Sequence, residues 1–170
     1  MPHLTRRILI WLLSGLLAPA GQAQAPLPAP AQSVILSIGG SIRLRNQGDS
    51  AAFDAAMIDA LPAHSFRTST PWFTMPVTFS GPRLQDVLDA VGATGTSLHL
   101  VALNDYAVRI PMEDVRKFGP LLARRIDGKV IGVRDKGPLF LIYPFDDKPE
   151  TRTELYYARS IWQLARITVE

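Results

Sequence analysis

An apolar run in the C-terminal half of the chain places the strongest constraint on its fold. The run LFLIY at residues 139–143 has almost no polar interruption, which is typical of a β-strand covered on both faces. A second β-type run at residues 129–133 precedes it, and a Gly-Pro pair between the two favours a turn. We therefore predict a buried pair of strands, with residues 139–143 at the centre of the sheet. The turn carries Arg134 and Lys136, which suit either an anionic or carbonyl-rich ligand or a solvated hairpin tip.

The first 23 residues have the organisation of a secretory signal peptide. Arg6 and Arg7 precede an apolar stretch that ends at Leu17, and small residues follow, with cleavage expected after Ala23. An uncleaved membrane anchor is the alternative, although the apolar stretch is short for a membrane span. We therefore expect the protein to be exported.

The rest of the chain is expected to form one domain behind a tether. Residues 24–32 are rich in Pro and Ala, which predicts an unpacked, polyproline-like spacer, and residues 33–170 are enough for a hydrophobic core. Without the two leader arginines the chain has 16 basic and 15 acidic residues, so its charge gives no reason to expect nucleic acid as a partner. Cysteine is absent, which excludes disulfides, thiolate metal ligands and cysteine nucleophiles.

Local patterns predict a domain that mixes strands and helices. Strands are expected at 33–38 and 41–45 as a hairpin around a Gly-Gly turn, at 64–73, at 77–79, at 98–103 and 106–110 as a second hairpin, and at 161–169. Helices are expected from Asp49 or Ser50 to residue 61, at 82–91 and at 112–118, while 121–125 is helical or turn-like. Residues 145–153 are expected to form a charged loop, and 154–159 are ambiguous.

The segment at residues 64–73 carries more hydroxyl groups than a half-buried strand needs. Thr68, Ser69 and Thr70 stand where apolar residues would alternate, which suggests hydrogen bonding to a ligand. Pro71 stiffens the chain before Trp72. An edge strand with Trp72 in the core is the alternative.

Several segments together resemble the molybdopterin-binding domain of the sulfite oxidase fold. They are residues 79–88, 104–114, 127–128, 136–139, 143–144 and 160–169, and they cover most of the expected domain. The resemblance implies a single α+β domain with a mixed β-sheet, a barrel-like core and flanking helices. Within this superfamily the chain is most similar to small, stand-alone exported members. Characterised examples bind pterins in the periplasm and control a membrane cyclic-di-GMP enzyme or a sensor kinase.

One departure from the family's enzymes bears on the chemistry. Those enzymes ligate molybdenum through a cysteine thiolate in the segment that corresponds to residues 67–72, and hydroxyl side chains occupy that segment here. A neutral hydroxyl is a poor substitute for a thiolate on this metal. The resemblance therefore implies a non-catalytic periplasmic protein that binds a pterin, tetrahydropterin-type or molybdopterin-related, without molybdenum. The implied partner is the periplasmic region of an inner-membrane signalling protein.

A pterin is a flat, polar heterocycle, so its pocket needs an aromatic face and fixed hydrogen-bonding groups. We expect Trp72 to form a wall, Asn104 and Asp105 to contact the pterin edge, and Arg67 and Lys136 to face a carbonyl or an anion. The expected ligand-binding residues are Arg67, Thr68, Ser69, Thr70, Trp72, Asn104, Asp105, Tyr106, Lys136 and Arg159.

Alternatives remain for single residues and for the whole protein. Trp162 is a further aromatic candidate with the core as its alternative, and Arg159 has Glu154 or Asp146 as alternative partners. His64 and His99 are too few for a metal site. An oxidoreductase that holds molybdopterin without the thiolate and a ligand-free adaptor between proteins are the alternative functions.

Overall fold

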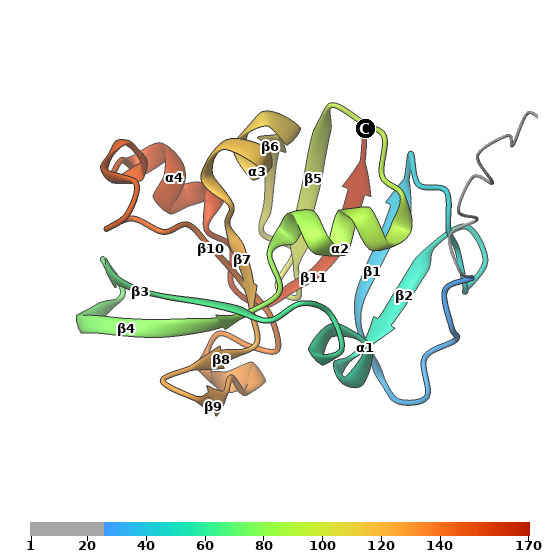
Figure 1. Ribbon diagram of the computed structural model, residues 1–170, viewed down its shortest axis with the longest axis horizontal. Coiled ribbons are helices and arrows are strands. Elements are labelled where there is room, and N and C mark those ends of the chain that lie inside the picture. Colours follow the sequence, from blue (N-terminus) through green and yellow to red (C-terminus); the bar gives the residue numbers. More distant parts are fainter. Residues whose placement is uncertain (1–25) are drawn as a thin grey trace, which may run out of the picture.

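The computed structural model describes residues 26–170 (Figure 1), so the expected signal peptide at residues 1–23 lies outside the described part of the chain. The strands are β1 (Val34–Gly40), β2 (Ala51–Asp54), β3 (His64–Thr70), β4 (Phe73–Gly81), β5 (Ser97–Ala102), β6 (Ala107–Pro111), β7 (Leu121–Ala123), β8 (Arg125–Ile126), β9 (Lys129–Val130), β10 (Phe140–Ile142) and β11 (Leu164–Val169). The helices are α1 (Ala55–Asp59), α2 (Leu84–Val91), α3 (Met112–Phe118) and α4 (Glu154–Arg159), with short 3₁₀ helices η1 (Val133–Asp135) and η2 (Pro149–Thr151).

A five-stranded sheet forms one half of the molecule. Its order is β2-β1-β11-β5-β6, and β11 pairs in parallel with β1 and antiparallel with β5. Helix α2 crosses in front of this sheet in Figure 1. Its apolar residues are fully buried with those of the strands: Leu84, Val87, Leu88 and Val91 pack with Leu36, Ile38, Leu100 and Ile167. Burial of this stripe, rather than the propensity of one eight-residue helix, holds α2 in place.

A second, aromatic cluster fills the other half. The β3–β4 hairpin extends away from the main sheet (Figure 1), in a four-stranded sheet ordered β3-β4-β8-β9, while β7 and β10 form a pair of their own. Phe79, Phe140, Tyr143 and Phe145 are almost completely buried in this cluster. The three sheets are open in residues 26–170, so the α+β prediction is confirmed, whereas the barrel-like core does not close.

The predicted strand pair around residues 129–143 is only half right. Residues 139–143 are completely buried, but β10 pairs with β7, and β9 pairs with β8. Asp127 and Gly128 both have positive φ, 47° and 79°, as a tight Asp-Gly hairpin turn requires. This turn joins β9 to β8 and leaves residues 133–135 to form η1, so residues 129–130 are exposed rather than buried.

The predicted Gly-Gly hairpin near the start of the domain is wrong. Strand β1 continues through Gly39 and Gly40, and its antiparallel partner is β2, not residues 41–45. Gly40 has φ 82°, and a Cβ there would clash with the carbonyl oxygen of Val169. Glycine is therefore needed for a close approach between β1 and β11 rather than for a turn.

Other boundaries differ because tertiary pairing overrides local pattern. Residues 51–54 form β2, so the helix predicted from Asp49 or Ser50 shortens to α1, with Asp54 as its N-cap. Residues 121–123 and 125–126 are strands rather than helix or turn. Strand β11 begins at Leu164 rather than at the predicted residue 161, and its pairing with β5 has a register shift between Leu164 and Arg166. The β5–β6 hairpin, α2 and α3 are confirmed.

The Pro/Ala segment is not a free spacer over the residues that the structure describes. Residues 26–32 form no helix or strand, but the amide groups of Ala31 and Gln32 donate to Oδ2 of Asp54 at 2.8 and 2.9 Å. Leu27 packs against the main core. Among residues 26–170, no helix has the length and apolar character to span a membrane.

Candidate ligand-binding pocket

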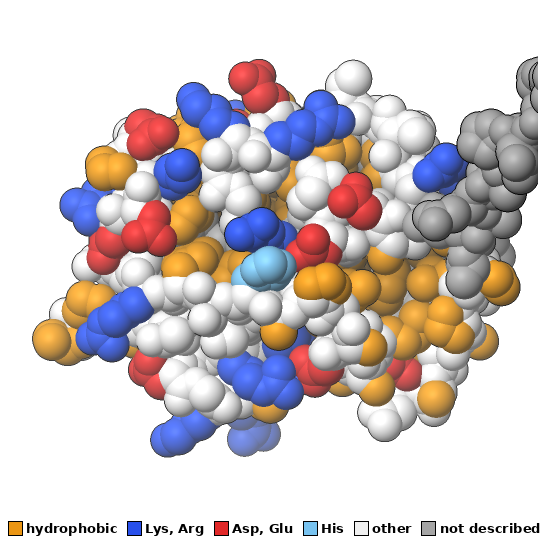
Figure 2. All heavy atoms as spheres, viewed as in Figure 1, with side chains coloured by type: hydrophobic (Ala, Val, Ile, Leu, Met, Phe, Trp, Pro, Cys, Tyr) orange, Lys and Arg blue, Asp and Glu red, His pale blue; other side chains and the backbone are white. Residues whose placement is uncertain are grey.

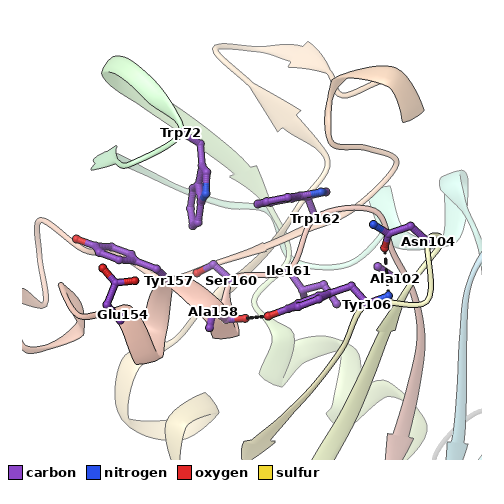
Figure 3. A pocket seen from close by; sticks show the side chains of 10 residues that line it. All are labelled: Trp72, Ala102, Asn104, Tyr106, Glu154, Tyr157, Ala158, Ser160, Ile161 and Trp162. Atoms are coloured by element: carbon purple, nitrogen blue, oxygen red, sulfur yellow. Dashed lines mark hydrogen bonds between the residues drawn. The ribbon is translucent and has the colours of Figure 1, made fainter.

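A cavity of about 340 Å³ opens between the tip of the β3–β4 hairpin, helix α4 and the turn between β5 and β6. Figure 3 shows Trp72 on one side of this cavity, Tyr157 and Glu154 at one end, and Trp162 and Asn104 at the other. Its lining consists of Trp72, Ala102, Asn104, Tyr106, Glu154, Tyr157, Ala158, Ser160, Ile161 and Trp162. Segments far apart in the sequence therefore build one site.

The aromatic walls are held by edge-to-face packing. The Trp72 ring lies 5.8 Å from the Trp162 ring and 6.1 Å from the Tyr157 ring, at interplanar angles of 78° and 80°. Phe140 supports both tryptophans from the buried side, with centroids 5.6 and 6.1 Å away. Such T-shaped contacts stabilise by about 0.5–1.5 kcal/mol each beyond burial. The pocket is thus bordered by aromatic surfaces in fixed orientations.

The polar groups of the pocket are few and specifically placed. Asn104 Oδ1 accepts a hydrogen bond from the Tyr106 amide at 3.2 Å, and the Tyr106 hydroxyl donates to the Ala158 carbonyl at 2.9 Å (Figure 3). The first bond leaves the Asn104 NH₂ group available to a ligand. Glu154 forms no ion pair with any residue of the described chain. A donor amide and an acceptor carboxylate therefore face the same aromatic cavity.

The structure brings three of the expected ligand-binding residues together. Trp72, Asn104 and Tyr106 line the cavity. Lys136 lies beside it, since its ammonium group sits 4.4 Å from the centroid of the Trp162 ring. Trp162 is half-buried and combines both roles considered from sequence, because it packs on Phe140 and also lines the cavity.

The three hydroxyl residues of β3 serve protein contacts instead. Thr68 is fully buried; its hydroxyl donates to the Ser69 carbonyl and accepts from the Asp146 amide. The Ser69 hydroxyl donates to Asp146 at 3.1 Å, and the Thr70 hydroxyl accepts from the Trp72 amide at 3.2 Å. Ser69 and Thr70 line a separate, shallower hollow that shares Tyr157 with the cavity.

Three expected residues lie outside the cavity. Arg67 is exposed on β3 and does not line the cavity. Asp105 is exposed and pairs with Arg166 at 3.2 Å. Arg159 pairs with the buried carboxylate of Asp114, which is neither of the partners considered from sequence.

Sequence reasoning missed the contribution of α4. Glu154, Tyr157 and Ser160 line the cavity, and their segment was ambiguous because a helix of six residues has no clear period. Contacts within the fold set the position of this segment. The ring centroids of Tyr157 and Phe145 lie 5.0 Å apart, and the Ser160 hydroxyl donates to the Tyr156 carbonyl. An aromatic pair, Tyr156 and Tyr157, separated from Glu154 by one leucine was the available signal.

Electrostatics around the site favour fixed protonation states. Burial acts to raise the pKa of Asp146, but hydrogen bonds from Ser69 and Arg152 outweigh it, so this pKa lies below its usual value. Burial, followed by the nearby charge of Asp114, raises the pKa of both Tyr143 and Tyr156. These groups keep one charge state near neutral pH and serve as structural supports.

Comparison with known proteins bears on the fold. No family model and no curated protein matches the chain. Solved structures do match, among them the sulfane dehydrogenase SoxCD from Paracoccus pantotrophus, with a TM-score of 0.60, 16% sequence identity and coverage of 79% of this chain. The chain has a sulfite oxidase-type fold. The match takes in 37% of the SoxCD chain, so the likeness establishes the fold and not the activity.

The side chains of the 67–72 segment do not fit a molybdenum centre of the family type. The chain has no cysteine, and the hydroxyls of Thr68, Ser69 and Thr70 are engaged by Asp146 or by the backbone. In residues 26–170 no cluster of three or more His, Asp or Glu side chains is placed to hold a metal ion. We derive no step through such a centre.

Proposed function

We propose that this protein is a non-catalytic, pterin-binding protein. The observation that carries the proposal is the cavity between Trp72, Trp162 and Tyr157, whose aromatic surfaces can border a flat bicyclic ring. Its volume, about 340 Å³, lies at the small end of the range for sites that enclose small organic ligands.

The polar groups support a heterocycle with an aminopyrimidine edge. A pterin presents an amino group and a ring N–H side by side, and a carboxylate accepts two parallel hydrogen bonds from such a pair. Glu154 supplies this carboxylate, and the Asn104 NH₂ group is placed to donate to a ring carbonyl or nitrogen. In this assignment Glu154 replaces Asp105, whose carboxylate is paired with Arg166.

The proposed setting is the periplasm. The expected signal peptide and the sequence resemblance to exported pterin-binding proteins support this location. There the ligand, tetrahydropterin-type or molybdopterin-related and without molybdenum, sets the affinity of the domain for an inner-membrane signalling protein, either a cyclic-di-GMP enzyme or a sensor kinase. Such a sensor requires a difference in partner affinity between the free and the bound states.

The test combines release and titration. Mass spectrometry and fluorescence identify small molecules released from the purified protein, and titration with reduced and oxidised pterins gives affinities. We expect Glu154→Gln to weaken binding at least about tenfold, since a charge-assisted hydrogen bond contributes about 1.5–3 kcal/mol. Glu113→Gln removes an exposed carboxylate outside the cavity lining and serves as the matched control.

Truncation of Trp72 is less informative than the sequence suggests. Its ring contacts Phe140, Phe145, Tyr157 and Trp162, so Trp72→Ala would remove core packing as well as a pocket wall. Asn104→Ala is the cleaner second variant because Asn104 is exposed. Equal pterin affinity for the Glu154 and Asn104 variants and the wild type would refute the assignment, and molybdenum in natively purified protein would favour the oxidoreductase alternative.

A further inference from the structure

A second concave surface lies apart from the candidate ligand-binding pocket and shares no lining residue with it. It is a groove of about 400 Å³ between the start of β3, the C-terminal end of α3 and the loop after β10. A neighbouring groove of similar volume continues from it, and the two share Arg83, Arg116 and Gly119. We call the two together the basic groove.

Basic side chains outnumber acidic ones in the lining of the basic groove. Arg83, Arg116, Lys117 and Lys148 line it against two acidic residues, Asp147 in the main part and Asp89 in the neighbouring part. None of these four cations forms an ion pair with any residue from 26 to 170. The chain without its leader arginines is nearly neutral. Unpaired positive charge is therefore concentrated here, where concave walls strengthen its field.

The floor of the basic groove is apolar. Phe66 and Phe118 lie among its lining residues, and Lys117 sits 4.8 Å from the Phe118 ring centroid. In Figure 2 the face between the β3–β4 hairpin and α3 shows hydrophobic side chains together with basic ones, a histidine and some acidic ones. An occupant that combines negative charge with apolar side chains would match both features.

One wall of the basic groove is the edge of a sheet. Strand β3 pairs with β4 on one side, and within the described chain no strand pairs with its other side. His64, Ser65 and Phe66 of this strand line the groove. A strand edge presents backbone donors and acceptors that an extended peptide can use.

We propose that the basic groove binds an extended, acidic segment of another protein, in which acidic residues alternate with apolar ones. The acidic side chains face Arg83, Arg116, Lys117 and Lys148, and the apolar ones lie on Phe66, because Phe118 is only 4% exposed. A concave groove with an apolar floor fits a peptide better than a membrane surface, which needs protruding cations. The chain's own residues 1–25 are no match, because their charges are positive.

The experiment measures fluorescence anisotropy with a labelled peptide of alternating Glu and Val. We expect the full protein to bind it, with an affinity that falls as salt is raised, and to bind a Gln-for-Glu peptide at least about tenfold more weakly. Reversal of two charges, Arg116→Glu with Lys117→Glu, should weaken peptide binding about tenfold or more. Lys148→Glu, in the loop after β10, should also weaken peptide binding.

The matched control is Lys129→Glu with Arg134→Glu, which changes net charge equally at exposed positions outside the groove and should leave affinity within about twofold. Thermal unfolding verifies that each variant is folded. Equal peptide binding by both double variants would overturn the proposal. Binding of phosphatidylglycerol vesicles or inorganic phosphate without peptide binding would also overturn it. So would self-association that the groove variant abolishes, since the groove would then join two copies of the protein. Loss of pterin binding alone would leave it standing.

Discussion

Asp114 links helix α4 to helix α3. Its side chain is 9% exposed and accepts hydrogen bonds from the guanidinium of Arg159 and from the hydroxyl of Tyr143. Arg159, expected from sequence as a ligand contact, thus ties α4 to α3. Because α4 supplies Glu154 and Tyr157 to the cavity, this ion pair positions the site without touching it.

Replacement of Asp114 by Asn should destabilise the protein by about 3 kcal/mol, since it leaves the poorly exposed guanidinium of Arg159 without a counter-charge. Urea unfolding followed by circular dichroism measures the change. Tyr143→Phe removes one long hydrogen bond of 3.4 Å and should cost about 1 kcal/mol or less. If the free energy of unfolding fell no more in the Asp114 variant than in the exposed Glu113→Gln control, the ion pair would have no structural role.

A second residue-scale prediction concerns pH. Hydrogen bonds from the backbone amide of Met57, and then of Gln32 and Ala31, hold the pKa of Asp54 below its usual value. A carboxyl whose pKa is lower in the folded state contributes stability at pH values above its unfolded pKa, and this contribution is lost as the pH falls below about 4. The gap in unfolding free energy between wild type and Asp54→Asn should therefore be constant near neutrality and shrink on acidification. A pH-independent gap would contradict this.

At the scale of elements, residues 26–32 belong to the domain. Two of their backbone amides donate hydrogen bonds to Asp54, and Leu27 packs against the main core. The side-chain amide of Asn46 donates to the Pro28 carbonyl at 2.7 Å. A chain that starts at Ser33 should be less stable than one that starts at Pro26, by about 1 kcal/mol from Leu27 burial alone. Thermal unfolding of the two truncated chains measures this, and identical midpoints would show a passive spacer.

The elements that local sequence predicts are those whose signals are local. The β5–β6 hairpin follows from its Asn-Asp turn, and α2 follows from its apolar spacing and from Gly92, which ends it with φ 62°. The partners of β1 lie in β2 and β11, and no local pattern specifies a parallel pairing with the far end of the chain. The Gly-Gly pair predicts a turn from its local pattern, whereas Gly40 permits the close approach of β1 to β11.

The residues of the candidate site also divide into those with a local sequence signal and those that depend on distant partners. Trp72, Asn104 and Tyr106 could be predicted because turns and a proline place them at the ends of strands. The place of Arg159 could not be predicted, since its partner Asp114 lies on another helix. The roles of Thr68 and Ser69 likewise depend on Asp146, far along the chain.

At the scale of the whole molecule, the cavity and the basic groove lie in separate sets of residues. A pterin present at a hundredfold excess over its dissociation constant should raise the free energy of unfolding by about 2.7 kcal/mol. The Arg116→Glu, Lys117→Glu variant should show the same rise, because the two sites share no lining residue and independent sites are close to additive. Differential scanning calorimetry measures both, and a smaller rise in the variant would show that the two sites are coupled.

The order of the main sheet also determines when the domain can form. Strand β11 lies between β1 and β5, yet it is made of residues 164–169 and is the last strand of the described chain in sequence order. A nascent chain that stops short of Leu164 lacks the strand that joins β1 to β5, so the β1–β2 and β5–β6 pairs stay unjoined. The sheet therefore cannot be completed before residues 164–169 have been synthesised, which leaves an interval in which chaperones can hold the chain unfolded.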